Sequence, residues 1–164
     1  MRIRQSRPED LEEMLRIYEI ARRFMAEQGN PHQWGDDNYP AEELLKEDIR
    51  EQRSYICEED GAVVGTFCYW IGEEPSYREI REGEWMNDQV YGVIHRIASD
   101  GRVKGIGSAV VDWCLNRHKN LRIDTHEKNL VMRNLFRKKG FTYCGKITVD
   151  DGTERFAYQK ILES

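Results

Sequence analysis

The chain has 164 residues, of which 39% are hydrophobic, 34% charged and 10% aromatic, and its formal net charge is -5. That length fits one domain that buries about two thirds of its unfolded surface, and the recurring aromatic residues argue against disorder. The acidic balance disfavours nucleic acid as a partner. The longest apolar run, AVVGTFCYWIG at 62–72, is too short for a membrane span, and MRIRQSRPED lacks a signal-peptide pattern, so we expect a cytoplasmic protein with no membrane partner.

The first half of the chain predicts a strand, two helices and a hairpin. MRIRQ precedes a helical segment in which Ser6 and Glu9 have capping-box spacing and Gly29 follows the last turn. The loop NPHQWGDDNYP then leads to a second short helix, AEELLKEDIR. Beyond it the apolar period becomes that of strands, and Asp60-Gly61 stands where a hairpin turns.

The second half alternates strands and helices. An irregular acidic segment, GEEPSYREIREGEWMND, precedes a strand around VYGVIHRIAS. A helix at about 105–118, the strand LRIDT, a helix at about 129–139 and a hairpin turning at Asp151-Gly152 complete the chain. The resulting order β, α, α, β, β, β, α, β, α, β, β predicts an α/β fold with helices covering a mostly antiparallel sheet.

The segment GRVKGIGSA at 101–109 lies where a strand gives way to a helix. Glycines at 105 and 107 permit close backbone approach and positive φ, so several N–H groups can point into one concavity beside the positive end of the helix. Arg102 and Lys104 would add charge-assisted contacts. The segment therefore predicts a site for a phosphate-sized anion, and the alternative is a glycine-rich turn that only joins the two elements.

Two other phosphate motifs fit the segment less well. A P-loop needs a lysine after its glycines, whereas Lys104 precedes them. A dinucleotide fingerprint would explain Gly105, Gly107 and the later Asp124, but Val110 stands in place of the third glycine. Too little chain remains for several βα units, which also opposes the dinucleotide interpretation.

Two segments together resemble a known family. RVKGIG at 102–107 resembles the Arg/Gln-x-x-Gly-x-Gly pattern of GNAT-superfamily N-acetyltransferases. NLVMRNLFRKKGF resembles a later segment of that superfamily, with Asn129, Leu135, Gly140 and Phe141 in register. NPHQWGDDNYP and VYGVIHRIA further resemble a bacterial subgroup of mostly unassigned substrate. The element order agrees along the whole chain, which implies a GNAT fold with 1–164 as a single N-acetyltransferase domain.

The resemblance implies acetyl-CoA as the cosubstrate and assigns its contacts. The strand backbone at Ile97, Ala98 and Ser99 would pair with the pantetheine arm, as an added strand pairs with a sheet edge. Asn129 would contact the arm from the other side, and it is equally a good helix N-cap. The pyrophosphate would be held by Arg102, Val103, Lys104, Gly105, Ile106, Gly107 and Ser108.

The chain departs from the family where an acid is usually supplied. Phe136 stands at the position that a tyrosine usually holds next to the cofactor, and it has no proton to give. The thiolate then leaves unassisted or takes a proton from water, or Tyr143 supplies it, or the chain is a poor catalyst. Phe136 can also be an ordinary core aromatic.

His95 is the candidate base of the chemistry. Strand alternation puts Tyr91, Val93, His95 and Ile97 on one face, where the superfamily often places an acid or a histidine toward the acceptor amine. An imidazole titrates near neutral pH and can take a proton directly or through water. A structural histidine paired with a carboxylate is the alternative. Residues at 124–127 could extend His95 into a relay or form a solvated rim.

The acceptor is expected to bind on less regular parts of the chain. The resemblance places the loop between the first two helices on the acceptor side, and there Gln33, Trp34 and Tyr39 could form a pocket wall, with Asp36-Asp37 attracting a cationic amine. Trp85 would close the same pocket. The alternative is that these aromatic residues attach loops to the core.

The sequence thus predicts an acetyl-CoA-dependent N-acetyltransferase acting on a small primary amine. A non-catalytic acyl-CoA-binding or sensing module is the alternative, because Phe136 lacks a hydroxyl. No metal is expected, since HEKNL lacks the second histidine of HExxH and the scattered cysteines form no CxxC pair. A homodimer is left open.

Overall fold

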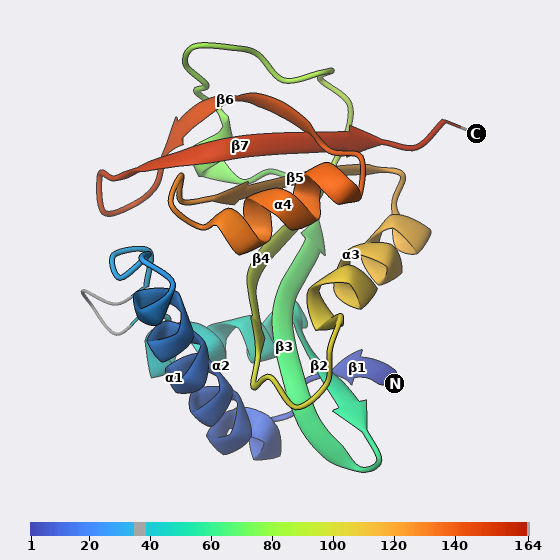
Figure 1. Cartoon of the computed structure of the whole chain (residues 1–164). Coiled ribbons are helices and arrows are strands. Elements are labelled where there is room, and N and C mark those ends of the chain that lie inside the picture. Colours follow the sequence, from blue (N-terminus) through green and yellow to red (C-terminus); the bar gives the residue numbers. More distant parts are fainter. Residues whose placement is uncertain (35–38, 164) are drawn as a thin grey trace. The chain divides into compact units, whose positions relative to one another are not determined.

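The computed structural model describes residues 1–34 and 39–163 (Figure 1). Its strands are β1 (Arg2–Gln5), β2 (Ser54–Glu59), β3 (Ala62–Ile71), β4 (Gly92–Ser99), β5 (Asn120–Thr125), β6 (Thr142–Thr148) and β7 (Glu154–Ile161). Its helices are α1 (Leu11–Glu27), α2 (Glu42–Arg50), α3 (Ile106–Arg117) and α4 (Leu130–Lys138), with short 3-10 turns η1 (Pro8–Asp10) and η2 (Pro75–Tyr77). The order of helices and strands confirms the order predicted from the sequence.

The strands hydrogen-bond in the order β1-β2-β3-β4-β5-β7-β6. The ladders β1–β2, β2–β3, β5–β7 and β6–β7 are antiparallel, and β4 runs parallel to β5. The predicted α/β class with a mostly antiparallel sheet is therefore confirmed. Both predicted hairpins form, and the first turns through Asp60 and Gly61 at φ 51° and 82°, the positive values that its two-residue turn requires.

Two compact units make up the chain, and β3, β4 and α3 each contribute residues to both. The first unit contains Met1–Tyr69 and His95–Val110. The second contains Trp70–Ile94 and Val111–Ser164.

The core of the first unit forms beneath α1 and α2. The apolar residues of α1 recur at helical spacing and meet residues of the following loop, α2 and the strands. The buried members are Met14, Ile17, Tyr18, Ala21, Trp34, Leu45, Ile56 and Ala98.

The predicted capping box at the start of the first helix is wrong. The Ser6 hydroxyl lies 2.7 Å from the Ser54 hydroxyl on β2, so it is used across the fold. Asp10 takes its place, because its Oδ2 accepts a hydrogen bond from the Arg7 amide at 2.7 Å. The Arg4 guanidinium also donates to both carboxylate oxygens of Asp10, at 2.9 and 3.0 Å.

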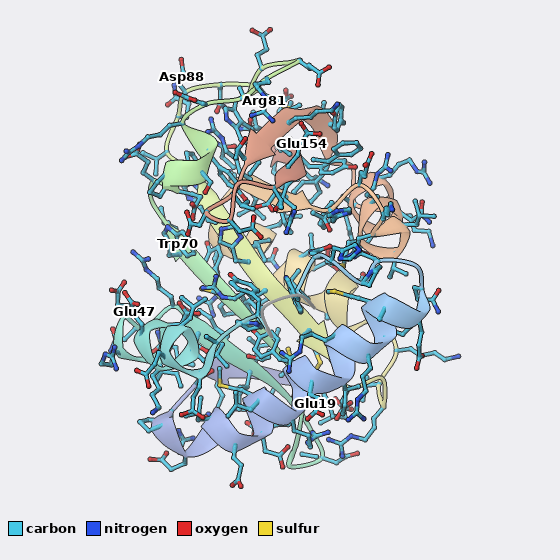
Figure 2. All side chains as sticks on the ribbon, turned by 90° about the vertical axis from the view of Figure 1, so that its left-hand side faces the viewer. Glu19, Glu47, Trp70, Arg81, Asp88 and Glu154 are labelled. Atoms are coloured by element: carbon cyan, nitrogen blue, oxygen red, sulfur yellow. The ribbon has the colours of Figure 1, made fainter. Side chains whose placement is uncertain are left out.

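The irregular segment 72–91 is attached to the sheet of the second unit by polar contacts. The Asn87 carboxamide oxygen accepts hydrogen bonds from Asn120 at 3.1 Å and from Gln159 at 3.2 Å. Its backbone carbonyl accepts one from Arg122 at 2.7 Å. Earlier in the segment, Arg81 pairs with Glu154 of β7 at 3.0 Å, and the two side chains lie close together in Figure 2. The segment is therefore a fixed part of this unit.

Candidate functional site

The loop before α3 is organised around the carboxylate of Asp100, whose side chain is 1% exposed. Its Oδ1 accepts a hydrogen bond from the Arg102 amide at 3.1 Å, and its Oδ2 pairs with Arg16 at 3.1 Å and with the Arg102 Nε at 2.7 Å. Burial disfavours the ionised carboxylate, but these donors outweigh burial and hold the pKa of Asp100 below its ordinary value. The negative charge of Asp100 therefore fixes the loop.

The side chain of Arg102 stabilises this loop by hydrogen bonds. Besides Asp100, its guanidinium donates to the Val63 carbonyl at 2.9 Å. The expected contact of the Arg102 side chain with an anion stays a prediction. Lys104 is exposed, as is Arg102, whose side chain is 53% exposed.

Gly105 has the backbone that the anion-site hypothesis needs. Its φ is +81°, and a Cβ built on it would meet no atom within 4 Å, so open space adjoins the backbone there. The next residue begins α3, whose first N–H groups have no acceptor inside the helix. Gly107 differs from the expectation: positive φ was predicted there, but it lies in the first turn of α3 and is not among the glycines with positive φ. A helical backbone explains this difference.

β4 offers a backbone edge on its β5 side. Within the described residues, the β4–β5 ladder consists of the pairs Gly92↔Leu121 and Val93↔Arg122, although β4 continues to Ser99. Residues 97–99 lie beyond these pairs, as the predicted contacts with an extended ligand require. Ala98 is 4% exposed and its side chain packs into the core of the first unit, so Ala98 offers only its backbone to a ligand at this edge.

The predicted alternation of β4 ends at His95. Arg96 has a φ of 56°, which is rare for a residue with a side chain. A left-handed residue interrupts the two-residue period of a strand, so the prediction that Ile97 shares the face of Val93 and His95 is not supported. His95 itself is half-buried.

The acceptor-side loop packs inward more than its sequence suggested. Trp34 is 7% exposed, with its ring 5.6 Å from that of Tyr18 and 6.3 Å from that of Tyr39. Gln33 accepts a hydrogen bond from the buried Asn30 at 3.0 Å. These contacts match the alternative in which the aromatic residues attach the loop to the core. Asp36 and Asp37 lie outside the described residues.

Tyr39 connects this loop to β4. Its hydroxyl accepts a hydrogen bond from Arg96 at 2.9 Å, and its carbonyl accepts one from Arg22 at 3.2 Å. The acceptor-side loop is thus joined to the residue that follows the candidate base, and the first unit also contains the glycine loop.

Three of the predicted contacts lie in the second unit. The Asn129 Oδ1 accepts a hydrogen bond from the Met132 amide at 3.1 Å, which makes Asn129 the N-cap of α4. Phe136 is completely buried, so it has the environment of a core aromatic. The Trp85 indole donates to the Tyr77 carbonyl at 2.8 Å, and the Arg122 guanidinium lies 4.2 Å from its ring centre. Trp85 thus fixes segment 72–91.

Two tyrosines of the second unit were missed at the sequence level. The ring of Tyr158 on β7 lies 5.1 Å from that of Phe136, and its hydroxyl accepts a hydrogen bond from Arg133 at 3.2 Å. The Tyr77 hydroxyl donates to the Asp124 carboxylate at 2.6 Å. Burial, with the charge of Asp124 as a further cause, raises the pKa of Tyr77 far above its ordinary value, so Tyr77 is a hydrogen-bond donor at neutral pH.

The remaining candidates for a proton relay are less enclosed. The His126 Nδ1 faces the Lys128 amide at 3.1 Å, and the Glu127 carbonyl accepts a hydrogen bond from Arg133 at 2.8 Å. Tyr143, the other proposed acid, is 45% exposed. Burial favours its neutral phenol and raises its pKa.

The described residues, 1–34 and 39–163, form neither a cluster of metal-ligating side chains nor a membrane-spanning helix. No three histidine, cysteine, aspartate or glutamate side chains gather there as a metal ion would require. None of the helices described has the length and apolar character of a membrane crossing.

Comparison with known proteins decides the family. The model of the acetyltransferase (GNAT) family matches residues 13–141, a span that includes the glycine loop and α4. The chain belongs to the GNAT acetyltransferase family. No curated protein matches it.

Solved structures agree with this assignment. A GNAT-family acetyltransferase from Streptococcus agalactiae 2603 is 32% identical, with a TM-score of 0.90 over 99% of this chain and 96% of that chain. One from Listeria monocytogenes 4b F2365 is 18% identical, with a TM-score of 0.72 over 98% and 94%. The GphF GNAT-like decarboxylase, solved in complex with isobutyryl-CoA, is 14% identical and has a TM-score of 0.70 over 99% and 100%. The last two show a shared fold only.

Membership in the GNAT family indicates which ligand the glycine loop is suited to bind. GNAT proteins use an acyl-CoA, and the predicted pyrophosphate residues fall within the matched span. The backbone turn at Gly105 and the start of α3 are the features of this chain that fit a diphosphate.

Proposed function

We propose that this GNAT protein is an N-acetyltransferase that moves the acetyl group of acetyl-CoA to a primary amine of a small molecule. The observation that carries the proposal is the opening at Gly105, where a left-handed backbone with open space beside it leads directly into α3. Amides at a helix start and the positive helix end bind phosphate oxygens well. The Asp100 contacts keep this loop in shape before any ligand arrives.

The pantetheine arm is assigned to the backbone of β4 beyond its ladder with β5. That edge carries main-chain donors and acceptors, which an extended amide-containing arm can match. The thioester then lies near the left-handed turn at Arg96, next to His95. This arrangement rests on the backbone of β4 and needs no particular side chain at Ile97 or Ser99.

The chemistry assigned to His95 is proton removal from the acceptor. The amine nitrogen must be neutral to attack the thioester carbonyl; a C–N bond forms, the C–S bond breaks, and CoA leaves as a thiolate. His95 takes the proton that the nitrogen loses, directly or through a water molecule. Because Phe136 has no hydroxyl, the thiolate takes its proton from solvent or from a phenol such as Tyr143.

The small-molecule acceptor is assigned to the side of the loop that carries Gln33, Trp34 and Tyr39. Tyr39 supports this assignment because it is hydrogen-bonded to Arg96, the neighbour of His95. The buried ring of Trp34 would hold Tyr39 in place by packing against its ring. We place the protein in the cytoplasm, acting without nucleic acid or membrane.

A second candidate function is a non-catalytic module that binds or senses acyl-CoA. The observation that favours it is Phe136, which is completely buried and offers no proton at the position where the family usually has an acid. Both candidates share the same cofactor site and differ only in turnover.

Thermal melting tests the cofactor assignment shared by both candidates. A ligand that binds only the folded chain raises the melting temperature by mass action, so CoA at about a hundred times its dissociation constant should stabilise the fold by about 2.7 kcal/mol. NAD at the same concentration serves as the matched control. A shift with NAD and none with CoA would contradict the acyl-CoA assignment.

A further inference from the structure

The side chain of Arg96 on β4 contacts three other side chains of the first unit. Its Nε and Nη2 donate to the Asp48 Oδ2 at 3.1 and 2.7 Å, and its Nη1 donates to the Tyr39 hydroxyl at 2.9 Å. The Nη2 also lies 3.2 Å from the Cys68 sulfur. Both side chains of the Arg96–Asp48 pair are only 9% exposed.

The charge state of this cluster is well defined. Burial opposes the charge of Arg96, but the surrounding groups outweigh burial and raise the pKa of its guanidinium. Burial raises the pKa of Cys68 to about 12, so its sulfur remains a neutral thiol. Burial also raises the pKa of Asp48, while the charge and hydrogen bonds of Arg96 oppose that rise. Asp48 is the acidic side chain that pairs with the Arg96 guanidinium. Removing either partner would leave the other charge buried and unpaired.

The backbone of Arg96 is as unusual as its side chain. Its φ of 56° is a conformation that costs a residue with a Cβ about 1–2 kcal/mol, whereas glycine adopts it freely. An arginine at this position is therefore explained by its contacts and not by its local preference. The Tyr18 hydroxyl of α1 fixes the same residue from its other end, donating to the Arg96 carbonyl at 2.8 Å.

These contacts join two parts of the proposed active site. The left-handed turn directly follows His95, and Tyr39 belongs to the loop assigned to the acceptor. Asp48 comes from α2, which follows that loop in the chain. The side chain and the carbonyl of Arg96 thus hydrogen-bond with residues of α1, α2 and the loop, and so attach all three to the same point of β4.

We propose that Arg96 is a positioning residue: its side chain, held by Asp48 and Tyr39, fixes the left-handed turn of β4 and thereby sets His95 against the acceptor-side loop. This rests on the proposed function of His95 and the loop. Arg96 itself touches neither substrate nor cofactor, because its side chain is only 9% exposed and each nitrogen of its guanidinium already donates to a partner in the first unit. Its contribution is geometric, and a misplacement of about 1 Å costs an enzyme roughly 100-fold in rate.

Arg96→Lys is the principal test. Lysine keeps the positive charge beside Asp48 but cannot reach Asp48, Tyr39 and Cys68 together, because it lacks the planar fork of donors. We expect kcat/KM for the amine to fall by roughly 10- to 100-fold, while the CoA affinity measured by calorimetry stays at the wild-type value. Tyr39→Phe, which removes one of these contacts, should raise the KM for the amine more than it lowers kcat.

Arg4→Lys is the matched control. Like Arg96, Arg4 donates two hydrogen bonds to a poorly exposed aspartate of the first unit, here to its two oxygens, with side chains 16% and 11% exposed. It belongs to β1, however, and has no part in the proposed site. It should lose stability without losing kcat/KM per folded molecule. Equal loss of kcat/KM in the Arg4→Lys and Arg96→Lys variants would overturn the positioning role and indicate a general loss of stability.

A second variant covers the case in which Arg96→Lys does not fold. Arg96→Met combined with Asp48→Leu removes both buried charges together, a change that other proteins often tolerate without loss of stability. This double variant should fold, bind CoA and show the same fall in kcat/KM. Wild-type kcat/KM in the folded double variant refutes the proposal for Arg96 alone. A wild-type chain that binds CoA but acetylates no amine refutes the transferase proposal, and the role of Arg96 falls with it.

Discussion

Replacement of Gly105 by alanine separates backbone strain from loss of the anion site. Gly105 and Gly101 belong to the same loop and have nearly equal φ values, +81° and +84°, and a Cβ on either would meet no atom within 4 Å. Each alanine variant therefore pays only the left-handed strain, about 1–2 kcal/mol. At about 2–4 °C per kcal/mol for a chain of this size, both should melt a few degrees below the wild type.

The two variants should differ in their affinity for CoA. The Gly101 amide already donates to the Ser99 hydroxyl at 3.1 Å, so it has no part in the proposed site. At Gly105 the new methyl group would occupy the open space into which a phosphate must come, and the loss of one charge-assisted hydrogen bond there costs about 1.5–3 kcal/mol. The dissociation constant for CoA should then rise roughly 10- to 100-fold in Gly105→Ala and remain unchanged in Gly101→Ala.

Calorimetric titration with CoA measures both variants, and thermal melting confirms that they are folded. A folded Gly105→Ala protein that binds CoA as well as Gly101→Ala does would show that the loop before α3 is a connecting turn. The pyrophosphate assignment would then be wrong.

Three further predictions concern the base, the missing acid and the charge at the start of the chain. His95→Ala should lower kcat by roughly 100-fold, the reach of a positioned general base, with CoA affinity retained; an unchanged kcat and pH profile would exclude His95. Phe136→Tyr should change the rate only modestly and, because its hydroxyl enters a fully buried position beside Tyr158, should lower stability by about 1–3 kcal/mol on chemical denaturation; a large gain in kcat would contradict this. Burial opposes the charge of Asp10, but hydrogen bonds from Arg4 and a backbone amide outweigh burial and lower its pKa. The stability it adds is thus present above the ordinary aspartate pKa and lost as pH falls through the lowered one. The free energy of unfolding of Asp10→Asn, measured by denaturation, should therefore lie furthest below that of the wild type at neutral pH and equal it in strong acid. A difference in the free energy of unfolding that does not change with pH would refute the assignment.

The sequence predicted those parts of the fold that depend on local patterns. The helical spacing around Met14 and Tyr18, and the Asp60-Gly61 turn, act within a few residues and correctly predicted helices and a hairpin. The glycine loop was placed correctly because its position between strand and helix is itself a local signal. The backbone of Gly107 differed from the prediction, since a glycine in the sequence does not reveal whether it lies in a turn or in a helix.

Features that depend on distant partners could not be predicted. Arg96 lies in a strand-like run, and its left-handed φ is explained by contacts with residues 48 and 57 positions away. The Tyr77–Asp124 hydrogen bond joins residues 47 positions apart. The same reason accounts for the wrong capping box, because the partner of Ser6 is on β2. Side chains that act in the site by holding other residues carry no local signal of that role.

Product analysis tests the central claim most directly. The purified protein would be incubated with acetyl-CoA and a panel of small primary amines, and the acetylated amines and free CoA would be quantified by mass spectrometry. The proposed transferase predicts at least one acetylated amine, formed together with an equal amount of free CoA, at a rate that falls in His95→Ala. Tight binding of CoA without any acetylated amine would contradict the transferase and identify the chain as an acyl-CoA-binding module.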